Sequence, residues 1–304
     1  MIVDALVIGL GKIGLTSDLK NNKIISHCKS LNKSKKFNLI GGVDKSLNSR
    51  KLFSFLYKKK SFSFIKSALK NLDPNLIIVA TPTQTHLSII KKIILFKNKN
   101  LKCVLVEKPV GKDFYETKKI FNILNKNNIT GFVNFQRNSN PMFIKLSRDL
   151  KKERLFSCEV KYSGGMINNG SHFLQLFKYF FGPIMNYILI EKKTVNKYDF
   201  RFTGFIFFKK ANVYFLPDYN SKLVHSFKIN NSIGVYEYKN IQNSITFTKF
   251  SGKYKKKRIS TIDKSQSNVI NEIEKFFLKK KYKLIKLKDF LETKSILTKI
   301  KNER

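Results

Sequence analysis

Short apolar runs alternate with polar or amphipathic segments through the first 136 residues. Five runs have the length, the β-branched content and the flanking breakers of buried strands. They lie at residues 2–9, 37–44, 75–82, 102–109 and 129–135. Between the last two, apolar side chains recur on one helical face, which predicts a helix over 113–127. Strands that alternate with helices are typical of βαβ units and a parallel sheet.

The pattern changes after residue 136. A predicted helix at 141–152 precedes runs in which apolar and polar positions alternate with a period of two, joined by Asn, Lys and Gly turns. These runs predict antiparallel strands of a sheet with one exposed face. They lie at residues 155–165, 186–193, 200–216, 225–238 and 244–250. Two further helices, at 265–281 and 287–301, are expected to close the chain.

The composition agrees with a globular protein built from these predicted strands and helices. The 304 residues are 42% apolar and 13% aromatic, near the globular norm. The net charge of +40 would suit a nucleic-acid binder. The lysines are spread along the whole chain, however, and the short basic runs at 58–60, 255–258 and 279–281 are typical of solvated surface. We therefore expect nonspecific adhesion to polyanions at low salt, and no specific nucleic-acid partner.

Several classes of protein are excluded by what the sequence lacks. No apolar run approaches the roughly 18 residues that cross a bilayer, and the first residues lack the basic segment of a signal peptide. The three cysteines are far apart and odd in number, which argues against a disulfide framework. The four histidines are scattered, so no metal site is expected. These features predict a soluble, cytoplasmic protein.

A glycine-rich segment, "GLGKIG", follows directly on the first predicted strand. It fits GxGxxG: Gly9 allows a tight turn, Gly11 lets the backbone approach a pyrophosphate, and Gly14 lets a helix pack on the strand. Amide groups at the start of that helix, around Lys12 and Ile13, would bind the phosphates. The alternative is a glycine-rich turn without a ligand.

Asp44 ends the second predicted strand. A carboxylate there can accept hydrogen bonds from the adenosine ribose and repel a 2′-phosphate, so NAD is favoured and NADP is not excluded. Asp44 follows Gly14 by about 30 residues instead of about 20, which implies a polar insertion around "TSDLKNNK". Lys45 softens the preference, and a simple turn aspartate is the alternative.

Two further motifs end predicted parallel strands, where open α/β sheets bind ligands. These are "ATPTQTH" at 80–86 and "EKP" at 107–109. Later in the chain a "GG" pair leads to "NNGSH" at 168–172. With the opening GxGxxG, this order and spacing resembles the Gfo/Idh/MocA family of oxidoreductases over nearly the whole chain.

The resemblance implies a fold and an activity. The fold class is α/β: an N-terminal Rossmann domain, doubly wound and mostly parallel, at 1–136, then a substrate-binding α/β domain with an open, largely antiparallel sheet at 137–304. The implied reaction is hydride transfer between a nicotinamide cofactor and a hydroxyl or keto carbon of a sugar or sugar derivative. Family members commonly pair through the open sheet face, so a homo-oligomer is expected.

The same resemblance assigns roles to individual residues. Thr81 and Pro82 would line the cofactor cleft, and Glu107 would lie by the nicotinamide. Lys108 would bridge the nicotinamide and the substrate hydroxyl, and His172 would face the reacting carbon.

Other positions are less specific to the family. Asn168, Asn169 and Arg137 would contact the substrate, although Arg137 is equally explained as a solvated residue after a strand. His86 is interpreted as structural or adjacent to the cofactor.

We assign the acid/base role to His172 and the polarising role to Lys108. A histidine with a pKa near 6.5 suits proton transfer at neutral pH, whereas the ordinary pKa of lysine is about 10.4. The alternative is a core histidine, because His172, Phe173 and Leu176 share one helical stripe. The glycines at 164, 165 and 170 favour a site residue over an ordinary core helix.

Asn168 departs from the family pattern, which often has an aspartate four residues before the histidine. An amide can bind a substrate hydroxyl or orient the imidazole, but it cannot take a proton. The leading prediction is therefore a sugar dehydrogenase or reductase, and the "NNGSH" form resembles family members of surface-glycan biosynthesis. The alternative is a catalytically silent dinucleotide-binding sensor or scaffold.

Overall fold

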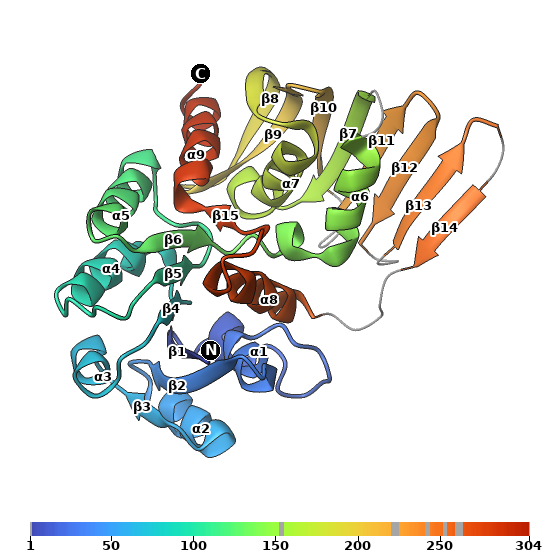
Figure 1. Cartoon of the computed structure of the whole chain (residues 1–304). Helices are drawn as coiled ribbons and strands as arrows, with labels where there is room; N and C mark the ends of the chain where they lie inside the picture. Colours follow the sequence, from blue (N-terminus) through green and yellow to red (C-terminus); the bar gives the residue numbers. More distant parts are fainter. Residues whose placement is uncertain are drawn as a thin grey trace. The chain divides into compact units, whose positions relative to one another are not determined.

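The computed structural model in Figure 1 describes residues 2–151, 155–219, 225–240, 244–251, 254–258 and 264–303. The chain divides into two compact units. The first comprises Met1–Ser139 and Ile262–Ser295, and the second comprises Asn140–Thr261 and Ile296–Arg304.

In the first unit, seven strands of the described chain form one sheet in the order β15-β6-β5-β4-β1-β2-β3. Their bounds are β1 Val3–Ile8, β2 Phe37–Val43, β3 Lys60–Phe62, β4 Leu76–Val79, β5 Cys103–Val106, β6 Thr130–Val133 and β15 Ile285–Lys286. Neighbours are parallel, except that β15 pairs antiparallel with β6. The predicted parallel sheet is confirmed, and its order reverses between β1 and β4, where such sheets bind dinucleotides. Short, polar β3 was not indicated by the apolar pattern.

Helices cover both faces of this sheet (Figure 1). Their bounds are α1 His27–Lys33, α2 Leu47–Tyr57, α3 Ile65–Asn71, α4 His86–Ile94, α5 Phe114–Lys126, α8 Ser265–Phe277 and α9 Leu287–Asn302. One core packs α1, α2 and α8 against the strands. The other packs α3, α4, α5 and the first turns of α9 against the opposite face. This two-sided burial explains why the central strands β4 and β5 are apolar along their whole length.

Residues 262–295 pack with the first unit, whereas the sequence pattern predicts a second domain that runs from residue 137 to the end. Val269, Ile270 and Ile273 of α8 are buried in the core that also contains α1 and β1. Helical periodicity identifies the buried face of α8, but it does not show which sheet covers that face. The helices themselves were predicted correctly.

The helix that follows the glycine-rich segment is short. Lys12–Thr16 form a single π-helical turn, residues 17–26 contain turns and bends, and α1 begins only at His27. The expected polar insertion is therefore confirmed. It closes on the buried carboxylate of Asp18, whose Oδ2 accepts hydrogen bonds from the amides of Ile25 and Ser26 at 2.7 and 2.8 Å.

In the second unit, eight strands of the described chain form a sheet in the order β14-β13-β12-β11-β7-β10-β9-β8. Their bounds are β7 Leu155–Ser163, β8 Ile184–Asn196, β9 Asp199–Phe208, β10 Ala211–Asp218, β11 His225–Asn231, β12 Gly234–Lys239, β13 Ser244–Lys249 and β14 Tyr254–Arg258. Neighbours are antiparallel, except that β7 and β10 are parallel. The predicted open, largely antiparallel sheet is confirmed.

Helices α6, Pro141–Lys151, and α7, Ser171–Phe181, pack on one face of this sheet. Aromatic rings fill the interface, with Phe177 within 5.5 Å of Phe227 and 5.6 Å of Phe181, measured between ring centroids. By contrast, Met185 and Ile188 of β8 are exposed. One face of the sheet is therefore core, and apolar side chains at its β8 edge meet solvent.

Tyr162 joins two strands that are not neighbours. Its side chain is fully buried, and its hydroxyl donates to the carbonyl of Phe202 at 2.9 Å and accepts from the Phe202 amide at 2.8 Å. Because β10 lies between β7 and β9, this pair of bonds fixes strands on either side of it.

We expect Y162F to lower the free energy of unfolding by about 1–3 kcal/mol, because two buried backbone groups lose their partner. Chemical denaturation measures this change. The control is Y115F, which removes the same hydroxyl from exposed Tyr115 of α5 and should change stability by less than about 0.5 kcal/mol. Equal stabilities of Y162F and Y115F would contradict the assigned role.

Candidate functional site

The three motif glycines have different reasons to be glycine. Gly9 directly follows β1 with φ +99°, and a Cβ on it would lie 2.6 Å from the carbonyl oxygen of Ala80. A Cβ on Gly14 would lie 1.9 Å from the carbonyl oxygen of Gly9. A Cβ on Gly11 would meet no atom within 4 Å. Packing therefore demands two of the glycines, while Gly11 leaves backbone open to an incoming ligand, as the pyrophosphate interpretation requires.

Asp44 lies directly after β2 and is bonded to this loop. Its Oδ2 accepts from the amide of Leu10 at 2.7 Å, and its Oδ1 accepts from the amide of Ser46 at 2.8 Å. A carboxylate has about four acceptor positions, so Asp44 can hold the glycine loop and still accept from ribose hydroxyls. Lys45 beside it is exposed.

A cavity of about 910 Å³ opens at the carboxyl ends of β1, β2 and β4. Gly9, Asp44, Thr81 and Pro82 line its polar side. Apolar side chains line much of the remainder, among them Phe64 with 67% of its surface exposed. A cavity with an acid at one end and apolar walls suits an adenosine group.

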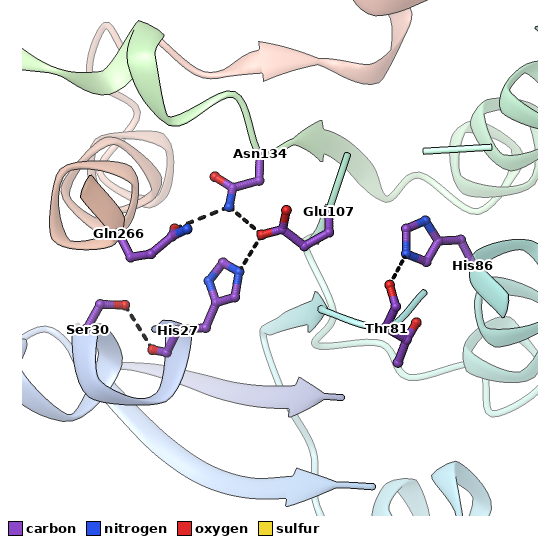
Figure 2. Close-up of polar contacts among 7 residues, drawn as sticks. All are labelled: His27, Ser30, Thr81, His86, Glu107, Asn134 and Gln266. Carbon is purple, nitrogen blue, oxygen red and sulfur yellow. Dashed lines mark hydrogen bonds and ion pairs between the residues drawn. The ribbon is translucent and has the colours of Figure 1, made fainter. Parts of the chain in front are cut away.

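His86 joins two loops, one of which carries Thr81 and lines this cavity. It is fully buried, and its Nδ1 and Nε2 lie 2.9 and 2.8 Å from the carbonyl oxygens of Val110 and Thr81. The side chain therefore ties the loop after β4 to the loop after β5, as Figure 2 shows for Thr81. These contacts support the structural interpretation of His86; direct contact with a cofactor stays a prediction.

Glu107 lies at the centre of a polar network that the sequence does not predict (Figure 2). Its Oε1 lies 2.8 Å from Nε2 of His27 and accepts from Nδ2 of Asn134 at 2.6 Å. Asn134 also donates to Oε1 of Gln266 at 3.2 Å. The network therefore joins the ends of β5 and β6 to helices α1 and α8.

The network holds Glu107 in its ionised form. Burial by itself would raise the pKa of this carboxyl. The hydrogen bond and charge of His27, then the hydrogen bond from Asn134 and the charge of Lys108, outweigh burial and lower its pKa. The stabilisation that this provides is present above the ordinary pKa of glutamate, about 4.3, and is lost as the pH falls through the lower folded value.

The remaining predicted residues of the first unit lie near these motifs. Lys108 follows Glu107 and is partly buried, and Arg137 lies in a 3₁₀ turn, Gln136–Ser139, after β6. Lys12 is exposed and Ile13 partly buried in the π-helical turn. The roles assigned to these four side chains stay predictions.

In the second unit, Asn168 and Asn169 lie in a π-helical turn, Met166–Gly170, and His172 is the second residue of α7. His172 is 8% exposed. Nδ2 of Asn169 donates to the carbonyl of Ser163 at 2.8 Å, so this side chain helps to close the turn. The acid/base role of His172 and the substrate contacts of the two asparagines stay predictions.

A carboxylate does lie beside Asn168, supplied by Asp199 of β9. Oδ2 of Asp199 accepts from Nδ2 of Asn168 at 2.7 Å and from its amide at 3.2 Å. Oδ1 accepts from the amides of Ile167 and Phe200 at 2.8 and 2.9 Å. Burial raises the pKa of Asp199, although these hydrogen bonds oppose the rise.

Asp199 also explains one of the glycines that favoured a site at His172. A Cβ on Gly165 would lie 2.1 Å from this carboxylate. The glycine therefore admits the aspartate and is not by itself a sign of catalysis. Asp199 has one sequence signal, an isolated acid at the start of an apolar strand, but its partner lies 31 positions away.

Some chemistry has no support among the described residues. No three side chains of His, Cys, Asp or Glu gather there to hold a metal ion, and no helix there combines the length and apolar character of a membrane span. Cys28, Cys103 and Cys158 are buried as free thiols. Burial raises the pKa of each, with help from Asp18 at Cys28 and Glu159 at Cys158. None is a reactive thiolate at neutral pH.

The comparison with known families decides the nature of the first unit. Residues 3–135 match the model of the Gfo/Idh/MocA oxidoreductases, described as an oxidoreductase family with an NAD-binding Rossmann fold. This match covers a little under half of the 304 residues. The resemblance inferred from the motifs is confirmed, as is NAD as the cofactor of the family. No curated protein matches the chain.

Solved structures extend the likeness to the fold of the whole chain. A dehydrogenase from Clostridium difficile matches with a TM-score of 0.79 at 18% identity, covering 99% of both chains. UDP-N-acetylglucosamine 3-dehydrogenase from Acidithiobacillus ferrooxidans matches with a TM-score of 0.78 at 12% identity, covering 99% of this chain and 97% of its own. A Bordetella pertussis dehydrogenase, in complex with NADH and UDP-GlcNAcA, matches with a TM-score of 0.74 at 14% identity, covering 98% and 95%.

The position of Asp44 in this Gfo/Idh/MocA unit gives a test of cofactor preference. We expect D44N to lower Kd for NADP⁺ relative to Kd for NAD⁺ by roughly tenfold, because the charge that repels a 2′-phosphate is gone. Titration calorimetry with both cofactors measures the ratio. The control is D73N at an exposed aspartate, for which the ratio should not move. An unchanged ratio in D44N would remove Asp44 from the ribose site.

The pairing of Asn168 with Asp199 gives a second test. N168D, which restores the common Gfo/Idh/MocA residue, would place two carboxylates in hydrogen-bond contact. We expect it to lower the free energy of unfolding by roughly 2–3 kcal/mol at pH 7. The loss should shrink as the pH falls, because protonation of one carboxyl removes the repulsion.

The double variant N168D/D199N exchanges the two groups and serves as the control. It should recover most of the stability that N168D loses at pH 7, as measured by chemical denaturation over a range of pH. If the double variant is no more stable than N168D, the two side chains are not coupled.

Proposed function

We propose that the chain is an NAD(H)-dependent dehydrogenase or reductase that acts on a CH–OH or keto carbon of a sugar or sugar derivative. The observation that carries this proposal is the glycine loop at the end of β1. Of its three glycines only Gly11 has open space around it, and the loop lies beside the 910 Å³ cavity within residues that match an NAD-binding family. A glycine turn without a ligand has no need of an open position at its second glycine.

The residues present fit a dinucleotide. Gly11 gives the pyrophosphate access to the backbone, Asp44 offers acceptors to the adenosine ribose, and the apolar wall near Phe64 offers a face to the adenine. NAD is the favoured form, because the Asp44 carboxylate would repel the 2′-phosphate of NADP. When bound, the nicotinamide would supply the hydride acceptor or donor.

Two side chains are proposed to act on the substrate. Lys108 would bind the reacting hydroxyl or carbonyl oxygen and polarise it with its charge. His172 would take the hydroxyl proton in oxidation and return it in reduction, because an imidazole exchanges protons near neutral pH. Arg137, Asn168 and Asn169 would bind other substrate groups.

The substrate class is supported by the similar structures. One is a UDP-N-acetylglucosamine 3-dehydrogenase, and another was solved with UDP-GlcNAcA. We therefore propose a nucleotide-linked sugar as the first class to try, with surface-glycan biosynthesis as its setting. We further propose that the protein acts in the cytoplasm and pairs with a second copy through the open sheet, where β8 exposes Met185, Ile188 and Ile190.

The decisive experiment supplies NADH with a panel of keto sugars, free and nucleotide-linked, and NAD⁺ with the corresponding alcohols. We expect turnover with at least one pair. H172A should then reduce kcat by about 10²–10⁴-fold while Kd for NADH stays within about twofold.

H225A is the matched control, because His225 is equally buried in the same unit and lies 5.8 Å from the ring of Phe173. It should retain most of the turnover. Equal losses in H172A and H225A would reduce His172 to a packing residue. Tight binding of NADH without turnover on any substrate would favour the alternative, a silent dinucleotide-binding sensor or scaffold.

A further inference from the structure

The network around Glu107 buries polar side chains that come from separate parts of the first unit. Its four members come from four elements, and three of them, His27, Asn134 and Gln266, are at most 4% exposed. Their polar groups have been removed from water, which is costly unless each finds a partner. Two atoms of the network, Nδ1 of His27 and Oδ1 of Asn134, are nevertheless buried without a hydrogen-bond partner among the described residues.

Both hydrogen bonds to Glu107 are donated to its carboxylate by the neighbouring side chains. A carboxylate oxygen only accepts, so Nε2 of His27 must carry the proton that it shares with Glu107. Asn134 donates to the same oxygen, Oε1. In the described part of the chain Oε2 of Glu107 accepts no hydrogen bond, and 13% of the side chain is exposed. The network therefore holds one oxygen of the carboxylate and leaves the other available to a ligand.

The strand order tells which part of a dinucleotide lies there. Asp44, at the end of β2, marks the adenosine side of the crevice, and Gly11 after β1 marks the pyrophosphate. Glu107 follows β5, on the other side of the reversal between β1 and β4. The half of the cofactor beyond the pyrophosphate is the nicotinamide half.

We infer that His27 and Asn134 position Glu107 as a fixed anion on the nicotinamide side of the crevice, and that this anion strengthens binding of oxidised over reduced cofactor. The inference rests on the proposed function, because it needs a nicotinamide dinucleotide in the site. The physical reason is charge: the nicotinamide ring is cationic when oxidised and neutral when reduced. A carboxylate nearby attracts only the former.

The charges that face Glu107 support this role. Lys108 stands next to it, and a lysine cation alone would disfavour the cationic ring. The Glu107 carboxylate offsets that charge. His27 of α1 donates to the carboxylate, while Asn134, which follows β6, and Gln266 of α8 are uncharged. Since these contacts hold the pKa of Glu107 below its ordinary range, the anion persists throughout the neutral range of pH.

The measured quantity is the ratio Kd(NADH)/Kd(NAD⁺) in the full-length protein, from titration calorimetry between pH 5 and 8. In the wild type we expect this ratio to be nearly constant. E107Q removes the charge and keeps the shape, so it should lower the ratio on the order of tenfold at every pH. E237Q removes one charge from the sheet of the second unit, where Glu237 pairs with Lys239, and should leave the ratio unchanged.

Two variants separate positioning from packing at His27. H27L removes the donor, so burial should raise the pKa of Glu107. The ratio should then match the wild type at pH 8 and fall towards the E107Q value at pH 5. H27Q keeps an N–H donor and should restore the wild-type profile. Circular dichroism checks that each variant is folded, and E107Q tests the charge even if H27L fails to fold.

The outcomes distinguish this inference from the proposed function. If the wild type binds neither NAD⁺ nor NADH, the proposed function fails and this inference fails with it. If the wild type binds both and E107Q keeps the wild-type ratio, only the fixed anion is overturned. If E107Q shifts the ratio while H27L and H27Q behave alike at every pH, His27 is a packing residue and the positioning role is overturned.

Discussion

The close approach of Gly9 to Ala80 is the contact on which the site depends. The end of β1 lies so near the end of β4 that no side chain fits between them, and Gly14 lies even closer to the carbonyl of Gly9. The chain must therefore turn sharply at the point where the strand order reverses. This turn brings Asp44 within reach of Leu10 and leaves Gly11 as the one motif glycine without a steric demand. A crevice that can take a dinucleotide follows from this packing.

The polar insertion after the glycine loop has a structural result of its own. It interrupts the first helix after one π-helical turn and lets α1 begin again at His27. The histidine thereby lies under the end of β5, against Glu107. Because Gln266 reaches the same network from α8, a segment more than a hundred residues away completes the first unit. Helix α8 thus contributes both an apolar face to the core of the first unit and Gln266 to the polar network around Glu107.

The carboxylate that the family pattern has at position 168 is supplied in this chain by Asp199, which lies in contact with Asn168. The family pattern leads one to expect a carboxylate at position 168, and this chain has an amide there. The structure supplies a carboxylate from β9 in direct contact with that amide. Its burial and its four hydrogen-bond donors suit a supporting role for the turn before His172. The absence of an acid at position 168 therefore does not leave the turn before His172 without a carboxylate.

The sequence by itself determined five strands of the first unit, the types of both sheets and the motifs, but it did not indicate β3 or β15. Apolar periodicity located β1, β2 and the later helices because burial on one or both faces leaves a direct signature in residue order. The glycine motif was readable for the same reason, since its demands are local. Only the tertiary structure decided that α8 covers the first sheet, that His27 and Asn134 hold Glu107, and that Asp199 accompanies Asn168. These contacts join residues far apart in the chain, and a residue's type records that it needs a partner without recording which partner the fold will bring.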